Sequence, residues 1–269
     1  SKVNIIMTKK KYAVVFDLDE TLGHFSQPYK FWFNLKKFLN DEFLDYKYFF
    51  NFLDIFPDFF RTNLFKILKK LKKNKISGKC DYVMIYTNNN GPMYWVNLIK
   101  TYIHKKLHYK LFDQIIKAFK IKGQHVEICR TSHNKSYKDF LSCTKLPPTT
   151  QICFIDDVEH DEMYHNNVVY IHVHPYKYNV PFNEIATKYY KSNKELFDKY
   201  NKTENEFIEF INTNTHKKLS NLYKTPTEKN IDTLISQKIH NDIERFLGNS
   251  NNYTRKNKSY KTATRTRKN

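Results

Sequence analysis

Two aspartates, Asp17 and Asp19, follow directly after an apolar run from Ala13 to Phe16, and Thr21 comes two residues later. On an extended backbone, side chains two positions apart point to the same side, so both carboxylates can face one spot. Two anions this close repel each other and raise a pKa unless a cation lies between them. The spacing therefore indicates a site that combines carboxylates with a cation.

Phosphoryl transfer would use every part of such a site. It requires a nucleophile, a proton donor for the leaving oxygen, and cations that neutralise the transferred group. Asp17 could attack phosphorus to form an aspartyl-phosphate, and Asp19 could protonate the leaving alkoxide and then deprotonate water. Mg²⁺ prefers carboxylates and waters as ligands, so it is the cation expected between Asp17, a backbone carbonyl of this loop and a further carboxylate.

Three more apolar runs predict the strands that position this chemistry: residues 82–86, 152–155 and 168–173. Short β-branched and aromatic runs are typical of parallel strands buried on both faces. Helical spacing occurs between them, over residues 64–71, 96–107 and 135–143. The alternation predicts an α/β fold: a Rossmann-like parallel sheet with helices on both faces.

Polar side chains stand at the ends of the first three predicted strands. Asp17 and Asp19 end the first, Thr87 follows the second, and Asp156 and Asp157 follow the third. In parallel sheets, ligands bind beyond the carboxyl ends of the strands. We therefore expect these residues to converge on one site.

The remaining requirement is a set of donors for phosphoryl oxygens. Thr87 and Asn88 offer neutral donors. Lys135 and Lys138 lie just before or within the helix that leads to the third strand, and either could supply the ammonium group. Lys135 is favoured because it lies where that helix begins.

These motifs resemble those of the haloacid dehalogenase superfamily. "DLDET", the strand-terminal Thr87, a lysine before a helix, and "IDD" look like its four motifs in their usual order. Glu20 within DxDxT looks like the FCP/SCP-type phosphatases, also called NLI-interacting-factor-like, which act on the RNA polymerase II C-terminal domain. "FRTNLFKIL" resembles their Arg-Pro-Gly helix, with Thr62-Asn63 in place of Pro-Gly. "KSYKDFLSCTKLP…CFIDD" looks closest to divergent versions from large DNA viruses. The resemblance covers residues 12–175.

The resemblance implies a role for each matched residue. Asp17 would be the nucleophile and Asp19 the acid/base, while Thr87 and Lys135 would bind the phosphoryl group. The predicted phosphate-binding set is Thr21, Thr87, Asn88 and Lys135, and the predicted Mg²⁺ ligands are Asp17, Asp19, Asp156 and Asp157. Cellular relatives usually have Asp-Asn where this chain has Asp156-Asp157, so the pattern does not say which of the two carboxylates contacts the metal.

Three segments are expected. A phosphatase domain of the haloacid dehalogenase type would span residues 1–190, with a short helical insertion after the first strand at 22–60. A helical C-terminal extension would span 191–248, begin near a capping box at "SNKE", and carry an apolar stripe from Ile231 to Phe246. A basic tail at 249–269 is expected to be disordered. The aromatic residues of the insertion, Trp32 among them, are interpreted as packing in preference to substrate recognition.

Composition limits the partners and the cellular compartments to be expected for this protein. The formal charge of +19 fits a phosphorylated protein, a nucleic acid or another acidic partner, with the basic tail as the contact, although AT-rich coding or a solubilising tail would also produce it. The four cysteines show no CxxC pair, which predicts reduced thiols and no zinc site. No signal peptide or membrane-length apolar run is evident, which predicts a soluble intracellular protein, nuclear, cytoplasmic or virus-encoded.

The expected function is Mg²⁺-dependent phosphomonoester hydrolysis, by a Ser/Thr protein phosphatase of the FCP/SCP type. No large cap domain is evident, and an uncapped site favours a macromolecular substrate. Two alternatives stay open: a polynucleotide 3′-phosphatase of the same superfamily, and a catalytically silent scaffold that binds through its helices and tail.

Overall fold

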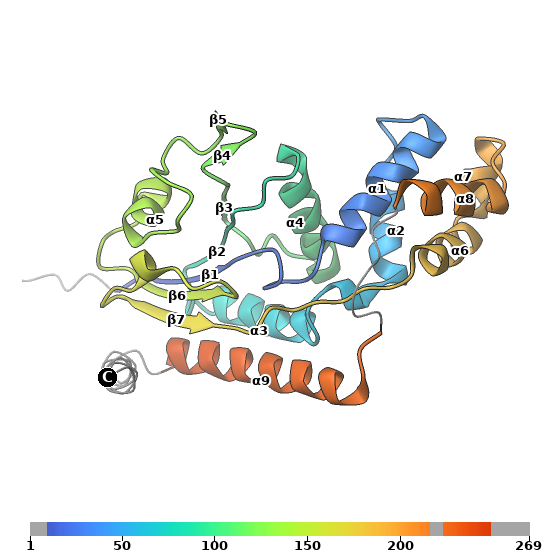
Figure 1. The fold of residues 1–269 in the computed structure, drawn as a ribbon. Coiled ribbons are helices and arrows are strands. Elements are labelled where there is room, and N and C mark those ends of the chain that lie inside the picture. Colours follow the sequence, from blue (N-terminus) through green and yellow to red (C-terminus); the bar gives the residue numbers. More distant parts are fainter. Residues whose placement is uncertain (1–9, 216–222, 249–269) are drawn as a thin grey trace, which may run out of the picture.

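The computed structural model describes residues 10–215 and 223–248, so the predicted basic tail lies outside the described residues. It has an α/β fold around a five-stranded parallel sheet with strand order β3-β2-β1-β6-β7 (Figure 1). The strands are β1 (Tyr12–Phe16), β2 (Tyr82–Tyr86), β3 (Gln114–Ile116), β6 (Gln151–Asp156) and β7 (Val168–His172). The predicted α/β fold and parallel sheet are confirmed.

The register of the central strands brings their carboxyl ends together. Phe16 of β1 lies opposite Ile85 of β2 on one side and Ile155 of β6 on the other. The Asp17 amide continues the ladder by donating to the Ile155 carbonyl at 2.9 Å. The polar residues that follow these three strands therefore emerge side by side.

Helices cover both faces of the sheet, as predicted. On β1, Val14 and Phe16 face one apolar core, while Ala13 and Val15 face the other. The larger core includes residues from α3 (Leu64–Ile76), α4 (Met93–Leu107) and α9 (Pro226–Gly248), and the smaller one includes Phe140 of α5 (Tyr137–Thr144). Burial on both faces explains why these strands read as nearly continuous apolar runs.

The predicted insertion is helical and belongs to the larger core. It forms α1 (Ser26–Leu39), α2 (Lys47–Ile55) and the short η1 (Pro57–Phe59). Trp32 is 0% exposed, and Phe31 stacks on Phe52 with ring centroids 4.5 Å apart. Most aromatic residues of this segment are core, whereas Phe33, Phe43 and Tyr46 are exposed. Trp32 is among the core residues and therefore has no surface for substrate contact.

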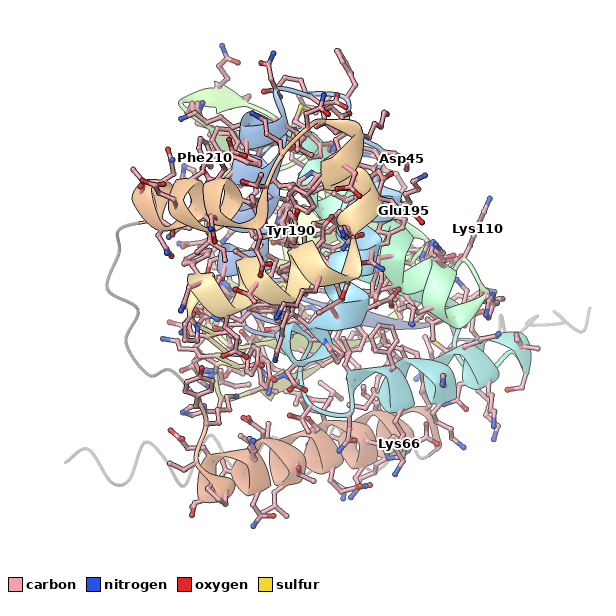
Figure 2. The ribbon with its side chains drawn as sticks, turned by 90° about the vertical axis from the view of Figure 1, so that its right-hand side faces the viewer. Asp45, Lys66, Lys110, Tyr190, Glu195 and Phe210 are labelled. Carbon is pink, nitrogen blue, oxygen red and sulfur yellow. A yellow bond between two sulfur atoms is a disulfide. The ribbon has the colours of Figure 1, made fainter. Side chains whose placement is uncertain are left out.

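The C-terminal helices divide between two places. α6 (Phe182–Ser192), α7 (Lys194–Lys199) and α8 (Glu204–Asn214) pack with the insertion, while α9 packs on α3 and β7 (Figures 1 and 2). The segment boundary expected at residue 190 therefore falls inside α6. On α9, Ile239, Ile243 and Phe246 are buried, whereas Ile231 and Leu234 are exposed, so only part of the predicted stripe is docked.

The capping box predicted at "SNKE" is wrong. Asn193 is the N-cap of α7 and makes no side-chain cap hydrogen bond. The capping box of this region lies one helix later, where Thr203 and Glu206 bond each other's backbone amides at the start of α8. Ser192 is instead the last residue of α6, which leaves the box no free N-terminus to cap.

The cysteine prediction is also wrong in part, because Cys129 and Cys143 form a disulfide. A short hairpin of β4 (Lys120–Ile121) and β5 (Gln124–His125) precedes Cys129 and turns the chain back toward α5. Cys80 and Cys153 are free and buried, as expected. None of the helices in the described ranges is long and apolar enough to cross a membrane.

Candidate active site

The Lys135 ammonium group lies between two carboxylates at the carboxyl end of the sheet. Its Nζ atom is 2.5 Å from Asp17 Oδ1 and 2.7 Å from Asp156 Oδ2. Asp17 follows β1, Asp156 ends β6, and Lys135 directly precedes the Ser136 cap of α5. All three side chains are buried, whereas Lys138 is exposed. Of the two candidate lysines, Lys135 is therefore the one at the carboxylates.

Burial sets the protonation of this group. It raises the pKa of Asp17 to about 8, against the opposing attraction of Lys135. Burial by itself lowers the pKa of Lys135, but the attraction of Asp17 and Asp156 outweighs it and raises that pKa. The ammonium group is therefore held in its charged form by its two partners.

Asp19 is fixed by a residue that the sequence analysis did not select. Asn89 Nδ2 donates to Asp19 Oδ2 at 2.7 Å, while the Asn89 amide donates to Thr87 Oγ1 and its Oδ1 accepts from the Gly91 amide. These bonds fix both ends of the Asn89 side chain. Burial raises the pKa of Asp19, and the bond from Asn89 opposes that rise. Asn88, the predicted donor, is exposed.

The alternation of side chains along the backbone could have identified Asn89. Thr87 and Asn89 are two positions apart, as Asp17 and Asp19 are, so the same argument that pairs the aspartates selects Asn89 over Asn88. Thr87 itself is buried at the end of β2. It lies at the predicted position, with its hydroxyl oxygen accepting the Asn89 amide at 3.0 Å.

Thr21 turns toward Asp157. Its hydroxyl donates to Asp157 Oδ1 at 3.0 Å and accepts from the Asp157 amide at 3.1 Å. Its side chain is buried, and the hydroxyl is committed to this neighbour. Thr21 thus positions a carboxylate in this structure, in contrast to the phosphate contact that the sequence predicted.

Two buried arginines brace the loops of the site. Arg61 donates to the carbonyls of Thr21, Glu20 and His174 at 2.6–2.9 Å. Arg130 donates to the carbonyls of Lys117 and His133 at 2.9–3.0 Å. Neither was singled out from the sequence, although Arg61 opens the segment that resembles the family's Arg-Pro-Gly helix.

The loop that Arg61 braces takes an uncommon backbone shape. Glu20 has φ 60°, in the left-handed region that side chains with a Cβ disfavour. The Glu20 amide donates to the Gly23 carbonyl at 2.7 Å, which closes a tight turn directly after Asp19. The turn and its arginine brace hold Asp17 and Asp19 at the mouth of the sheet.

Three carboxylates form a group that could hold a cation. The oxygens of Asp17, Asp156 and Asp157 all lie within 4.8 Å of one another. Hard oxygen donors at this spacing fit a hard divalent cation. The Asp19 carboxylate, also predicted as a ligand, is outside this group and bonded to Asn89. The site thus has four carboxyl groups and one ammonium group, and that ammonium group contacts only Asp17 and Asp156.

The histidines of the described ranges form no further metal-binding cluster. His160 Nε2 lies 3.6 Å from Asp156 Oδ2, and burial lowers the pKa of His160. His172 and His24 bond backbone carbonyls at 2.9 Å and 2.8 Å. These are contacts within the protein.

Comparison of the chain with protein-family models, curated proteins and solved structures found no match. Its chemistry is therefore argued from the site itself.

Proposed function

We propose that this chain is a Mg²⁺-dependent phosphomonoester hydrolase that acts through an aspartyl-phosphate on Asp17. The observation that carries the proposal is the ammonium group of Lys135, buried between Asp17 and Asp156 at the ends of neighbouring strands. An apolar core gains nothing from this arrangement, because burying an ion costs on the order of several kcal/mol. A site for a phosphoryl group needs it.

The donor set also fits a metal. Asp17, Asp156 and Asp157 would hold Mg²⁺, which would supply the positive charge that the excess of carboxylates lacks. Asp17 would attack phosphorus in its ionised form, which Lys135 and a bound cation would favour against the burial that raises its pKa. Lys135 would also orient the Asp17 carboxylate and draw charge from the phosphoryl oxygens. Burial raises the pKa of Asp19, which favours the protonated form from which it would give its proton to the leaving oxygen.

The same residues would complete the second step. Asp19, now ionised, would accept a proton from the water that attacks the aspartyl-phosphate, and Asn89 would hold its carboxylate in position. Thr87 would bind a phosphoryl oxygen through its hydroxyl hydrogen, because the Asn89 amide uses only the hydroxyl oxygen. Hydrolysis would return Asp17 to its starting state.

The substrate class we propose is a phosphoserine or phosphothreonine segment of a protein, as in the FCP/SCP-type phosphatases of the haloacid dehalogenase superfamily. The insertion supports this class, because it packs into the larger core, with Phe33, Phe43 and Tyr46 as its exposed aromatic residues, and so forms no separate apolar cap for a small molecule. The test compares phosphate release from phosphopeptides and sugar phosphates, with Asp17→Asn as the blank. Faster release from phosphopeptides is expected; release from sugar phosphates alone would refute this substrate class.

One observation favours the polynucleotide 3′-phosphatase alternative. A cavity of about 390 Å³ between α3 and α9 is lined by Lys66, Lys69, Lys70, Lys73 and His240. Figure 2 shows Lys66 on the side of α3 that faces α9. Such a surface suits a polyanion held by its backbone charge. Release from a DNA 3′-phosphate would then fall steeply as salt rises, whereas release from a phosphopeptide would fall less.

A further inference from the structure

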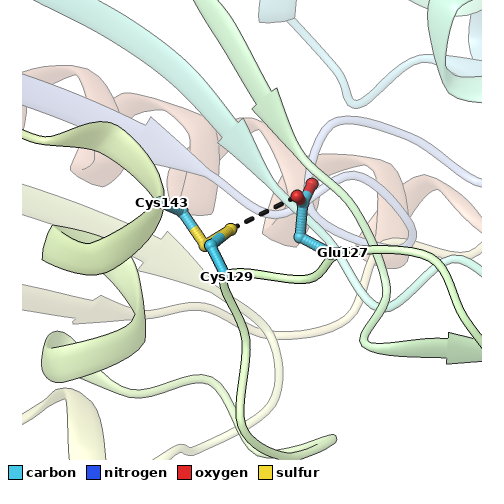
Figure 3. A group of neighbouring side chains, drawn as sticks. All are labelled: Glu127, Cys129 and Cys143. Carbon is cyan, nitrogen blue, oxygen red and sulfur yellow. Dashed lines mark hydrogen bonds between the residues drawn. A yellow bond between two sulfur atoms is a disulfide. The ribbon is translucent and has the colours of Figure 1, made fainter.

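The disulfide between Cys129 and Cys143 closes the loop that carries Lys135. Cys129 follows the β4–β5 hairpin, Cys143 lies in the last turn of α5, and the two are 14 positions apart (Figure 3). Lys135 and the Ser136 cap of α5 both lie inside this ring. The covalent link therefore fixes the two ends of the segment that delivers the buried ammonium group.

The linked pair is open to solvent, whereas the other two cysteines are not. Cys129 and Cys143 are both partly exposed. Cys80 and Cys153 are 1% and 0% exposed, and burial raises the pKa of Cys80 to about 12 and that of Cys153 well above its usual range. Thiol exchange requires an accessible sulfur and a thiolate. Cys129 and Cys143 are therefore more open to a small thiol in solution than Cys80 and Cys153, which supply internal controls.

Glu127 gives the reduced form a partner. Its Oε1 lies 3.2 Å from Cys129 Sγ, and its Oε2 accepts from the Lys117 amide at 3.0 Å (Figure 3). A disulfide sulfur has no hydrogen to donate, but the thiol of Cys129 would donate to this carboxylate. The contact thus favours the dithiol form of the pair over the disulfide.

We propose that Cys129 and Cys143 form a reversible redox latch on the Lys135 loop. A thiolate from a dithiol reductant attacks one sulfur of the pair and releases the other as a thiol. The second thiol of the reductant then displaces the first cysteine. Two electrons and two protons pass to the protein, and the reductant leaves as its own disulfide.

Opening the latch loosens the loop without unfolding it. Arg130 still bonds the His133 carbonyl, and Asp139 still accepts from the Thr131 amide and hydroxyl at 2.8–3.2 Å. What is lost is the restraint on the ring's ends. In the chain-entropy account, closing a ring of about 15 residues changes a folding equilibrium by about one hundred- to two hundredfold, which sets an upper limit on the effect of opening the disulfide.

The first experiment tests the latch without any assay of activity. The native chain is equilibrated with dithiothreitol redox buffers, alkylated, digested and read by mass spectrometry. Alkylation of Cys129 and Cys143 should rise together with reducing strength and reverse on oxidation, while Cys80 and Cys153 stay unlabelled. Alkylation of Cys129 and Cys143 in the oxidised chain, or reduction of the pair only under denaturing conditions, would overturn the proposal.

Glu127 supplies a sharper test. Glu127→Gln removes the acceptor for the thiol and should lower the ratio of dithiol to disulfide about tenfold in the same buffer, since a hydrogen bond to a charged group is lost. Glu162→Gln, which neutralises an exposed carboxylate elsewhere, should leave the ratio unchanged. Equal ratios in the two variants would remove Glu127 from the latch.

Hydrogen exchange measures the consequence. Amides of residues 130–142 should exchange faster in the reduced chain, while those of β1 and β6 keep their rates; Cys129→Ser/Cys143→Ser should match the reduced chain. Equal exchange in both redox states would refute the latch. The effect on catalysis rests on the proposed function: phosphate release should be slower after reduction. A chain that shows the exchange difference but no Asp17-dependent release would refute the function and leave the latch standing.

Discussion

Replacing Lys135 by methionine tests the electrostatics of the site by way of stability. The substitution keeps a long side chain but removes the charge between Asp17 and Asp156, which lie 2.5 Å and 2.7 Å from the ammonium nitrogen. Both carboxylates then remain buried without a cation. Removing one partner of a buried ion pair costs about 3–5 kcal/mol. Lys135→Met should therefore lower the free energy of unfolding by about that amount.

Urea denaturation in chelator, followed by circular dichroism, measures the loss. The chelator ensures that no metal ion replaces the missing charge. With a slope of about 2 kcal/mol per molar urea, the midpoint should fall by about 2 M. Lys138→Met is the matched control, because Lys138 is exposed and its loss should change stability by no more than about 0.5 kcal/mol.

A double variant separates charge from packing. Lys135→Met combined with Asp17→Asn removes the ammonium and one of the carboxylates it neutralises. The combined loss should be smaller than the sum of the two single losses by about 1–3 kcal/mol. Strict additivity, or a loss below about 1 kcal/mol for Lys135→Met alone, would refute the account of the buried cluster.

Three further predictions concern the fold and the site. Burial lowers the pKa of His104 from 6.5 to about 4, so the unfolded chain binds this proton first. The contribution of His104 to stability should be constant above pH 6.5 and fall from there toward pH 4, and the difference in urea midpoint between the native chain and His104→Gln should change over that range alone. Gly23→Ala should lower the free energy of unfolding, measured by heat or urea, by at least about 1–3 kcal/mol, because the new Cβ would lie 2.4 Å from a backbone oxygen. In the control Gly248→Ala the new Cβ has no atom within 4 Å, so the free energy of unfolding should be nearly unchanged. Asn89→Ala should slow phosphate release at least about tenfold, because Asp19 loses the hydrogen bond that holds its carboxylate. It should also raise the pH optimum, because that bond opposes the raised pKa of Asp19. Asn88 is exposed, so Asn88→Ala should change neither the rate nor the pH optimum.

The strands could be predicted because of how they are buried. Residues 82–86 form a nearly continuous apolar run, and the structure has β2 over the same residues. β3 was missed because it has three residues, two of them only partly buried, and so it leaves no run to detect. The periodicity of the helices located α3 and α4 for a similar reason: each presents one apolar face to the larger core.

Contacts between distant residues set the limit of prediction in the site. The convergence of Asp17 and Asp156 follows from the parallel sheet, whose strands end at one edge, and the sequence predicts that sheet. Thr21 bonds Asp157, 136 positions away, and no local pattern distinguishes that contact from one to phosphate. The same limit applies to the disulfide, because its two cysteines meet only through the fold of the loop and helix α5 that lie between them.

The measurement that tests the central claim most directly is phosphate release from an aryl phosphate, in Mg²⁺ and in chelator, by the native chain and by Asp17→Asn. The account predicts release that requires both Mg²⁺ and the Asp17 carboxylate. Folded native chain that releases no more phosphate in Mg²⁺ than Asp17→Asn does would contradict it.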